Sequence, residues 1–281
     1  MKIEFLGTGG AIPIPRPGSY SKVCKEAREK GVPYSRMGPS VFIHDLKLLI
    51  DTPEEIRLQL ERAHIQRVEA GIYSHWHPDH TMGRRIWETM AFETKKAWGT
   101  TVYLPEQVAA DMKQFLGSWD HLQFMHQQGW IDLQVLQDGH SFIKNNIKVT
   151  PFRLHEEYVY AFLLEENEKK VLIAPDELYK WEPPAHLIGN LDLAILPMGM
   201  VEFSWKTKER LIDRAHIERI REATFEETLE VVKKLRAKKT IITHIEEVDN
   251  LGHDELHEIA MDLQKEELNV MFAHDTMQIE I

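Results

Sequence analysis

The most informative stretch of this 281-residue chain is GIYSHWHPDH, residues 71–80. It begins with a short apolar run of the kind that forms a buried β-strand, and it then gathers three imidazoles and one carboxylate. Because side chains alternate along a strand, His75 and His77 are expected to project to the same side, where they can share one metal ion. Asp79 and His80 follow on the next turn and would face a second position. The stretch therefore predicts two adjacent metal ions.

Further ligands are needed, because four side chains cannot fill two coordination shells. Each is expected at the end of a strand, since open α/β sheets place their sites beyond the carboxyl ends of the strands. Three donors meet this condition, following short apolar runs directly or after one proline: His155, Asp176 and His244. Asp176 is the best candidate for a bridging ligand, because one carboxylate can give an oxygen to each ion.

Asp51 also ends an apolar run, Leu48-Leu49-Ile50. Its carboxylate could lie behind a ligand histidine, where it would orient the ring and fix its tautomer. Alternatively, Asp51 caps a helix that starts near Thr52 and Pro53. The sequence supports the two interpretations equally.

Short β-type runs alternate with amphipathic helices along the chain. The runs cover residues 3–5, 40–43, 46–50, 71–73, 101–104, 147–154, 160–164, 171–174, 193–196 and 240–243. Capping-box patterns at Thr52 and Thr224, each with a glutamate three residues on, predict two helix starts. Apolar stripes predict further helices around residues 108–116 and 256–263. Strands near both ends, with helices between them, predict an α/β layered sandwich formed by residues 1–281 as a single domain.

The composition is that of an ordinary globular chain with an acidic balance. Its 34 Lys and Arg face 45 Asp and Glu, which gives a formal charge of −11. This charge argues against a protein that coats nucleic acid. No stretch approaches ~18 uncharged apolar residues, and the start of the chain does not read as a signal peptide. Cys24 is the single cysteine, which excludes an internal disulfide framework, so a cytoplasmic protein without membrane contact is expected.

These residues resemble the metallo-β-lactamase superfamily, and the likeness covers nearly the whole chain. The fold that the resemblance implies is a four-layer αββα sandwich with a dinuclear site between its sheets. The implied ligand sets are His75, His77, His155 and Asp176 for one ion, and Asp79, His80, Asp176 and His244 for the other. His and Asp donors suit Zn, Mn and Fe alike, so two divalent ions are expected, with Zn or Mn preferred.

Within the superfamily, the chain is most similar to the phosphoribosyl cyclic phosphate phosphodiesterase family of the carbon-phosphorus lyase pathway, a relative of ribonuclease Z. Residues 7–13 (GTGGAIP) and 17–24 (PGSYSKVC) carry this likeness. Members of that family tend to have Gly-Cys-x-Cys-x-x-Cys in the second segment, which binds a structural zinc. Here Ser19 and Ser21 stand where the first two thiols belong, and Cys24 remains. Because hydroxyls are poor zinc ligands beside thiolates, we expect no structural zinc in this loop.

The resemblance also implies a hydrolase that acts on a small phosphodiester or nucleotide-like substrate. Water activated by the two ions would attack phosphorus, with Asp79 positioning it. His216 lies between the bridging aspartate and the last ligand histidine, where relatives carry a general acid, and it would protonate the leaving group. The basic stretch 206–221 supplies Arg210 and Arg214 as candidates for holding the phosphate. Relatives often dimerise, so a homodimer is a further expectation.

Three alternatives stay open. The same ligands serve ribonuclease Z, a tRNA 3′-end endonuclease, but the charge of −11 and the lack of a basic, Gly-rich arm argue against nucleic acid as a partner. The same activated water could instead attack carbon in a thioester or lactone. The non-enzymatic alternative is a metal-binding carrier or redox protein, against which stand the complete ligand set and the lack of a flavin domain.

Overall fold

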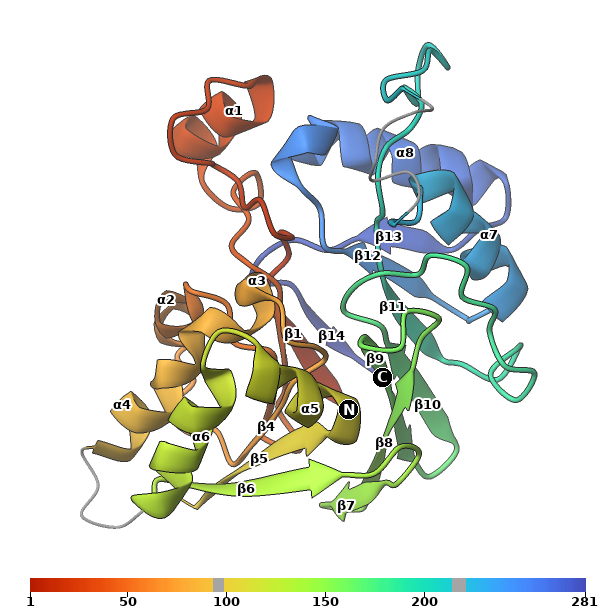
Figure 1. Ribbon diagram of the computed structural model, residues 1–281. Coiled ribbons are helices and arrows are strands. Elements are labelled where there is room, and N and C mark those ends of the chain that lie inside the picture. Colours follow the sequence, from red (N-terminus) through yellow and green to blue (C-terminus); the bar gives the residue numbers. More distant parts are fainter. Residues whose placement is uncertain (93–98, 214–220) are drawn as a thin grey trace.

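Residues 1–92, 99–213 and 221–281 are described by a computed structural model, shown in Figure 1. Two seven-stranded sheets form the centre of the molecule, and helices cover their outer faces. This arrangement confirms the predicted αββα sandwich.

The first sheet carries the histidine-rich stretch. Its strands lie in the order β14-β1-β2-β3-β4-β5-β6. Their bounds are β1 (Lys2–Gly7), β2 (Ser40–Ile43), β3 (Leu48–Ile50), β4 (Ala70–Ile72), β5 (Thr100–Pro105), β6 (Ile131–Leu136) and β14 (Gln278–Glu280). Strands β3 to β6 are parallel, so β3 and β4 end at the same edge of the sheet. Asp51, which follows β3, and the segment after Ile72, which follows β4, therefore lie side by side.

The second sheet carries the remaining donors. Its strands lie in the order β13-β12-β11-β10-β9-β8-β7. Their bounds are β7 (Phe142–Lys144), β8 (Ile147–Arg153), β9 (Tyr160–Glu166), β10 (Lys169–Ile173), β11 (Leu193–Pro197), β12 (Thr240–Thr243) and β13 (Val270–Phe272). Because β10, β11 and β12 are parallel, Asp176 and His244 follow strands that end at one edge.

Alternating side chains of the second sheet fill two separate core layers. In β9, Tyr160, Phe162 and Leu164 pack between the two sheets. Their neighbours Ala161 and Leu163 face the other way and join the core under α7 (Phe225–Leu235) and α8 (His253–Lys265). Since both faces of β9 are buried, the strand appears in the sequence as a continuous apolar run.

Helices on the first sheet occupy the other outer face (Figure 1). They are α2 (Ile56–Arg62), α3 (Pro78–Thr81), α4 (Ile86–Phe92), α5 (Glu106–Gln114) and α6 (Ser118–Gln127), with the short 3-10 helix η1 (Met82–Arg85) between α3 and α4. The capping box at Thr224 is confirmed at the start of α7. The one predicted at Thr52 is wrong, because α2 begins at Ile56 and the Thr52 hydroxyl lies 2.9 Å from the hydroxyl of Tyr73.

A segment between β1 and β2, residues 14–36, projects from the sandwich and carries α1 (Lys22–Lys30); we call it the arm. A small apolar cluster of Ile14, Val23 and Ala27 holds it together. Its polar groups converge on Glu247, in the 3-10 helix η3 (Glu247–Asp249) that follows β12. The Ser19 hydroxyl donates to Glu247 Oε1 at 2.6 Å, and Arg16 Nε lies 3.1 Å from Oε2.

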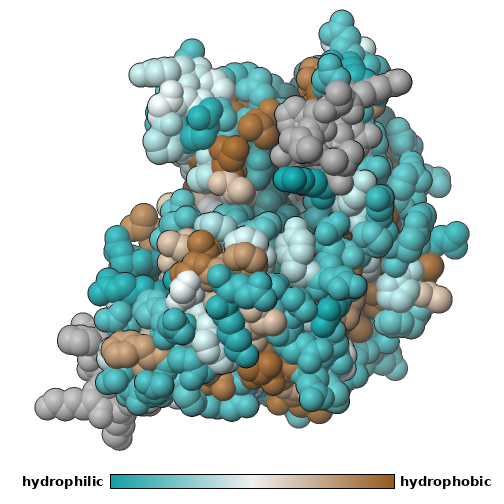
Figure 2. All heavy atoms as spheres, viewed as in Figure 1, coloured by the Kyte–Doolittle hydropathy of each residue, from teal (hydrophilic) through white to brown (hydrophobic). Residues whose placement is uncertain are grey.

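The face of the molecule seen in Figure 2 is mostly hydrophilic, and its apolar side chains form small, separate groups. Among the described residues, no helix combines the length and the apolar character that crossing a bilayer requires.

Candidate metal centre

The histidine-rich stretch leaves β4 as an extended segment and then enters α3. Pro78 occupies the first turn of that helix, a position where its missing N–H costs nothing. The turn is fixed by the Thr81 hydroxyl, which donates to the carbonyl oxygens of Trp76 (3.1 Å) and His77 (2.9 Å). His75 and His77 therefore precede the helix, whereas Asp79 and His80 lie on it.

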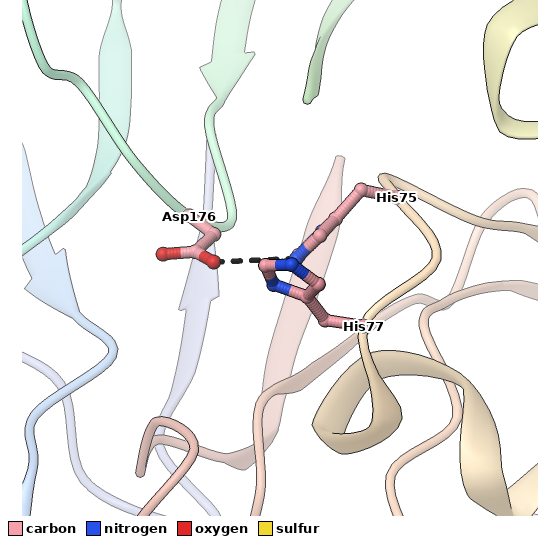
Figure 3. A group of neighbouring side chains, drawn as sticks. All are labelled: His75, His77 and Asp176. Atoms are coloured by element: carbon pink, nitrogen blue, oxygen red, sulfur yellow. Dashed lines mark ion pairs between the residues drawn. The ribbon is translucent and has the colours of Figure 1, made fainter. Parts of the chain in front are cut away.

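Six of the seven predicted ligands come together in two groups. The first is His75, His77 and Asp176, and the second is Asp79, His80 and His244. Within each group, one potential ligand atom from every residue lies within 4.8 Å of the others. Figure 3 shows the first group, in which two histidines from the first sheet meet the carboxylate that follows β10.

Asp176 lies between the two groups. Its Oδ2 is 3.4 Å from His75 Nε2, the ion pair that is dashed in Figure 3, and its Oδ1 is 3.5 Å from His244 Nε2. Oδ2 also lies 3.8 Å from Nε2 of His80, so the carboxylate contacts both groups, as a bridging ligand requires.

Four potential ligand atoms in this cluster are buried and yet make no hydrogen bond to any described residue. They are His75 Nε2, Asp79 Oδ2, His80 Nε2 and His244 Nε2. Buried polar groups are nearly always hydrogen-bonded, so four orphans in one place need a reason. Divalent ions with a preference for imidazole and carboxylate would satisfy all four, and the residues present therefore fit a dinuclear centre.

Asp51 lies behind the ligand histidines. Its Oδ2 accepts hydrogen bonds from His80 Nδ1 at 2.8 Å and from the Ser74 hydroxyl at 2.7 Å, and its Oδ1 accepts one from the Ser74 backbone N–H at 2.8 Å. The contact directs Nε2 of His80 toward the cluster. Of the two interpretations of Asp51, the structure supports the one that orients a ligand, because α2 has no side-chain cap.

Two of these residues have a backbone conformation that is uncommon outside glycine. The φ angles of Asp51 and His244 are 62° and 56°. Such strain is stored where the surrounding structure demands a particular geometry, and functional sites are typical places. The space beside His244 is equally restricted, since a Cβ at Gly10 would lie 2.6 Å from its ring.

The charges of the cluster are set by burial and by the close carboxylates. Burial and the imidazoles of His80 and His77 lower the pKa of His75 well below its usual value, so this ring is neutral. Burial alone would also lower the pKa of His244, but Asp176 and Asp79 raise it to about 9. Ion binding must therefore displace a proton from His244.

His155 does not join the cluster. Its side chain is exposed on the turn that follows β8, although the resemblance implied that it would be a ligand of the first ion. The same turn instead brings Tyr158 to the cluster, with ring centroids 5.4 Å from His77 and 6.1 Å from His75. Burial and the charge of Asp176 raise the pKa of Tyr158 to about 12. Sequence reasoning missed this residue, because a single tyrosine in a turn carries no spacing signal.

A cavity of about 280 Å³ opens over the metal cluster. Its wall includes Arg221. Besides the clustered ligands, it also includes four acidic residues: Glu177, Glu222, Glu246 and Asp249. Burial and the charge of Asp176 raise the pKa of Glu177 to about 8. The cavity is therefore lined largely by acidic groups, with Arg221 as the one Lys or Arg among its described lining residues.

The residues predicted to bind phosphate or to donate a proton have different outcomes. Arg210 pairs with the carboxylate of Glu202, stacks 4.5 Å from the centre of the Phe203 ring and is not among the described residues of the cavity wall. Arg210 is therefore not placed to bind phosphate in this cavity, because Glu202 already neutralises its guanidinium. Arg214 and His216 lie outside the described residues.

With the geometry established, the sequence can be compared with known families. Residues 47–245 match the family described as beta-lactamase superfamily domain. The chain belongs to this family. The match begins just before β3 and ends one residue after His244, so it spans all six clustered residues.

Solved structures of other beta-lactamase superfamily proteins share the fold. A diphosphatase from the PhnP family is 22% identical, with a TM-score of 0.70 over 100% of this chain and 97% of that chain. Zn²⁺-bound PqqB from Methylobacterium extorquens is 13% identical (TM-score 0.72; 100% of both chains). The short form of human tRNase Z is 18% identical (TM-score 0.64; 100% and 99%). No curated protein matches the sequence.

Proposed function

We propose that this superfamily member is a dinuclear metal-dependent hydrolase of small phosphodiesters. The observation that carries the proposal is the set of four buried ligand atoms without a hydrogen bond to any described residue, two of which, on Asp79 and His244, belong to residues that line a cavity. These atoms belong to residues from both sheets, and the carboxylate of Asp176 lies between the two groups of ligands. The names of the similar structures, a diphosphatase and a tRNase Z, agree with chemistry at phosphorus.

The cluster residues divide the work of holding the ions and the substrate. His75 and His77 would hold one ion and Asp79, His80 and His244 the other, with Asp176 between them. When bound, two divalent ions activate water near neutral pH and neutralise charge that builds up on a phosphoryl group. Asp79, whose pKa is held far below its usual value by the neighbouring His80 although burial opposes this, remains a carboxylate that can orient the attacking water.

Arg221 is the described residue best placed to hold the substrate phosphate, because it lies in the cavity wall and makes no hydrogen bond or ion pair with any described residue.

His216 remains our proposal for the proton donor to the leaving group. Replacing it with alanine should retain both ions and slow substrates with poor leaving groups far more than those with good ones; equal slowing would exclude the role.

The substrate is expected to be small. A cavity of about 280 Å³ lies at the lower limit for small-molecule sites and accepts a phosphodiester with a compact substituent. Arg221 is the one Lys or Arg among the described residues of its wall, whereas a tRNA backbone brings many phosphates that need basic partners. This favours a single phosphodiester over the tRNA 3′-end endonuclease alternative.

The test is hydrolysis of bis(p-nitrophenyl) phosphate by protein loaded with Zn or Mn, measured beside a thioester and a tRNA precursor. We expect turnover of the phosphodiester, a loss of at least 100-fold in Asp176→Asn, and a rise in KM in Arg221→Ala. Arg57→Ala, at an exposed position on α2, is the matched control and should be unaffected. Faster hydrolysis of the thioester by the wild type would overturn the proposal.

A further inference from the structure

Tyr158 stands beside the metal cluster but has no place yet in the proposed reaction. Its ring lies beside the imidazoles of His75 and His77, and the residue forms part of the cavity wall. The side chain is half-buried, so its hydroxyl is reachable from the cavity.

Three other tyrosine hydroxyls have partners among the described residues. Tyr73 is bonded to Thr52 and to Trp87, Tyr34 to Asp254, and Tyr160 to Asp138. Tyr158 makes no hydrogen bond to any residue that the structure describes. The hydroxyl of a half-buried phenol in a cavity wall that has no partner is available to a ligand.

The turn that carries Tyr158 is held firmly against the cluster. Leu154 N–H donates to the Val159 carbonyl at 2.9 Å, and Val159 N–H donates to the Glu156 carbonyl at 2.9 Å. A third bond, from Tyr160 N–H to the Ser74 carbonyl at 3.0 Å, joins the turn to the residue before His75. The backbone on both sides of Tyr158 is thus fixed relative to the segment that carries the ligand histidines.

The chemistry of the wall determines what this hydroxyl can bind. Most ionisable neighbours in the cavity wall are acidic groups, and burial raises the pKa of Glu177 to about 8 and that of Asp249 to about 7, so these two carry only part of their charge near neutral pH. A phosphoryl group that reaches the cluster needs donors, and Arg221 supplies one kind. A phenol hydroxyl is a neutral donor that can bond an anionic oxygen without adding charge.

We propose that Tyr158 is a substrate-binding residue whose hydroxyl donates a hydrogen bond to a non-bridging phosphoryl oxygen at the His75 and His77 side of the cavity. The inference rests on the proposed function, because it assumes that a phosphoryl group occupies this cavity. In this proposal Tyr158 binds an anionic oxygen of the substrate and is not needed for metal binding.

The test compares Tyr158→Phe, which keeps the ring and removes only the hydroxyl, with Tyr20→Phe at a tyrosine that is 79% exposed on the arm. Metal content is measured first. Binding of inorganic phosphate to the metal-loaded proteins is then measured by calorimetry, independently of turnover, and KM and kcat are measured for bis(p-nitrophenyl) phosphate. We expect Tyr158→Phe to keep its metal content, to bind phosphate about tenfold more weakly and to have a KM that is higher by a similar factor. This is the effect expected when one hydrogen bond to a charged group is lost.

The outcomes separate the two proposals. Wild-type binding and turnover with an unchanged Tyr158→Phe would overturn the inference and leave the proposed function intact. A loss of metal in Tyr158→Phe would also overturn it, since the phenol would then support the ligands. If the wild type neither binds phosphate nor hydrolyses the diester, the proposed function fails and the inference with it.

Discussion

His80 has a carboxylate near each of its ring nitrogens. Nδ1 donates to Asp51 at 2.8 Å, and Nε2 lies 3.2 Å from Oδ2 of Asp79. Burial opposes a charged ring, but Asp79 and Asp51 together raise the pKa of His80 well above its usual value. Ser74 extends the contact, because its hydroxyl bonds Asp51 and also lies 3.0 Å from Nδ1 of His75. One buried carboxylate thus controls the orientation of two ligand rings.

Asp51→Asn is expected to weaken metal binding by about 10- to 100-fold, because the amide removes the charge that orients His80 and supports its basicity. Competition with a chromogenic chelator measures the affinity. Asp45→Asn, at an exposed turn residue of the same sheet, serves as the control. Equal affinities of Asp51→Asn and the wild type would show that the carboxylate does not support the ligand.

Among the elements, the arm has its most buried polar anchor in Glu247, beside the contacts of Lys22 with Glu255 and of Tyr34 with Asp254. Hydrogen bonds from Ser19 and Ser21, together with the charge of Arg16, lower the pKa of Glu247 from 4.5 to about 2. The arm thus presents its hydroxyls to a carboxylate, in the loop where the resemblance places a metal-binding thiol cluster. Since Glu247 follows His244 by three residues, it also connects the arm to the loop that bears a ligand.

The pH dependence of this contact follows from its sign. A carboxyl group with a lowered pKa in the folded state stabilises the protein above pH 4.5, and the stabilisation is lost as the pH falls toward 2. Glu247→Gln should therefore destabilise the protein by about 1–3 kcal/mol at pH 7, with a smaller difference from the wild type at pH 3. Urea unfolding at both pH values tests this, with Glu29→Gln on the exposed side of α1 as control; a difference that does not depend on pH would contradict it.

The extent to which the elements could be predicted depends on burial. β9, β11 and β12 are buried on both faces, so they stand out as continuous apolar runs. Edge strand β6 was missed because polar residues interrupt it, as in Ile131-Asp132-Leu133-Gln134. Short β7 and β14 carry little apolar signal for the same reason.

For the molecule as a whole, the metal centre joins the two halves of the sandwich. Four of its clustered residues follow β4 in the first sheet, whereas Asp176 and His244 follow β10 and β12 in the second. The strand-end rule made these donors predictable from sequence. It could not reveal the path of the turn after β8, which exposes His155 and delivers Tyr158, because that path depends on packing against the completed cluster.

Removal of the ions should lower the stability of the whole molecule. Each ion present at about 100 times its Kd contributes about 2.7 kcal/mol, which corresponds to a decrease in Tm of roughly 5–10 °C for each ion removed by chelation. Scanning calorimetry with EDTA, followed by re-addition of Zn or Mn, measures the change. Asp176→Asn provides the comparison, since its Tm should respond much less to EDTA. A wild-type Tm that does not change on chelation would contradict the proposed metal centre.

Cys24 offers a way to observe the arm in solution. The chain has this single cysteine, and its thiol is fully buried beside Glu247, with Sγ 3.6 Å from Oε1. A bulky disulfide reagent can reach it only when α1 detaches, so the labelling rate counts spontaneous openings of that segment. The native protein thus carries its own reporter, and no engineered probe is required to time the event.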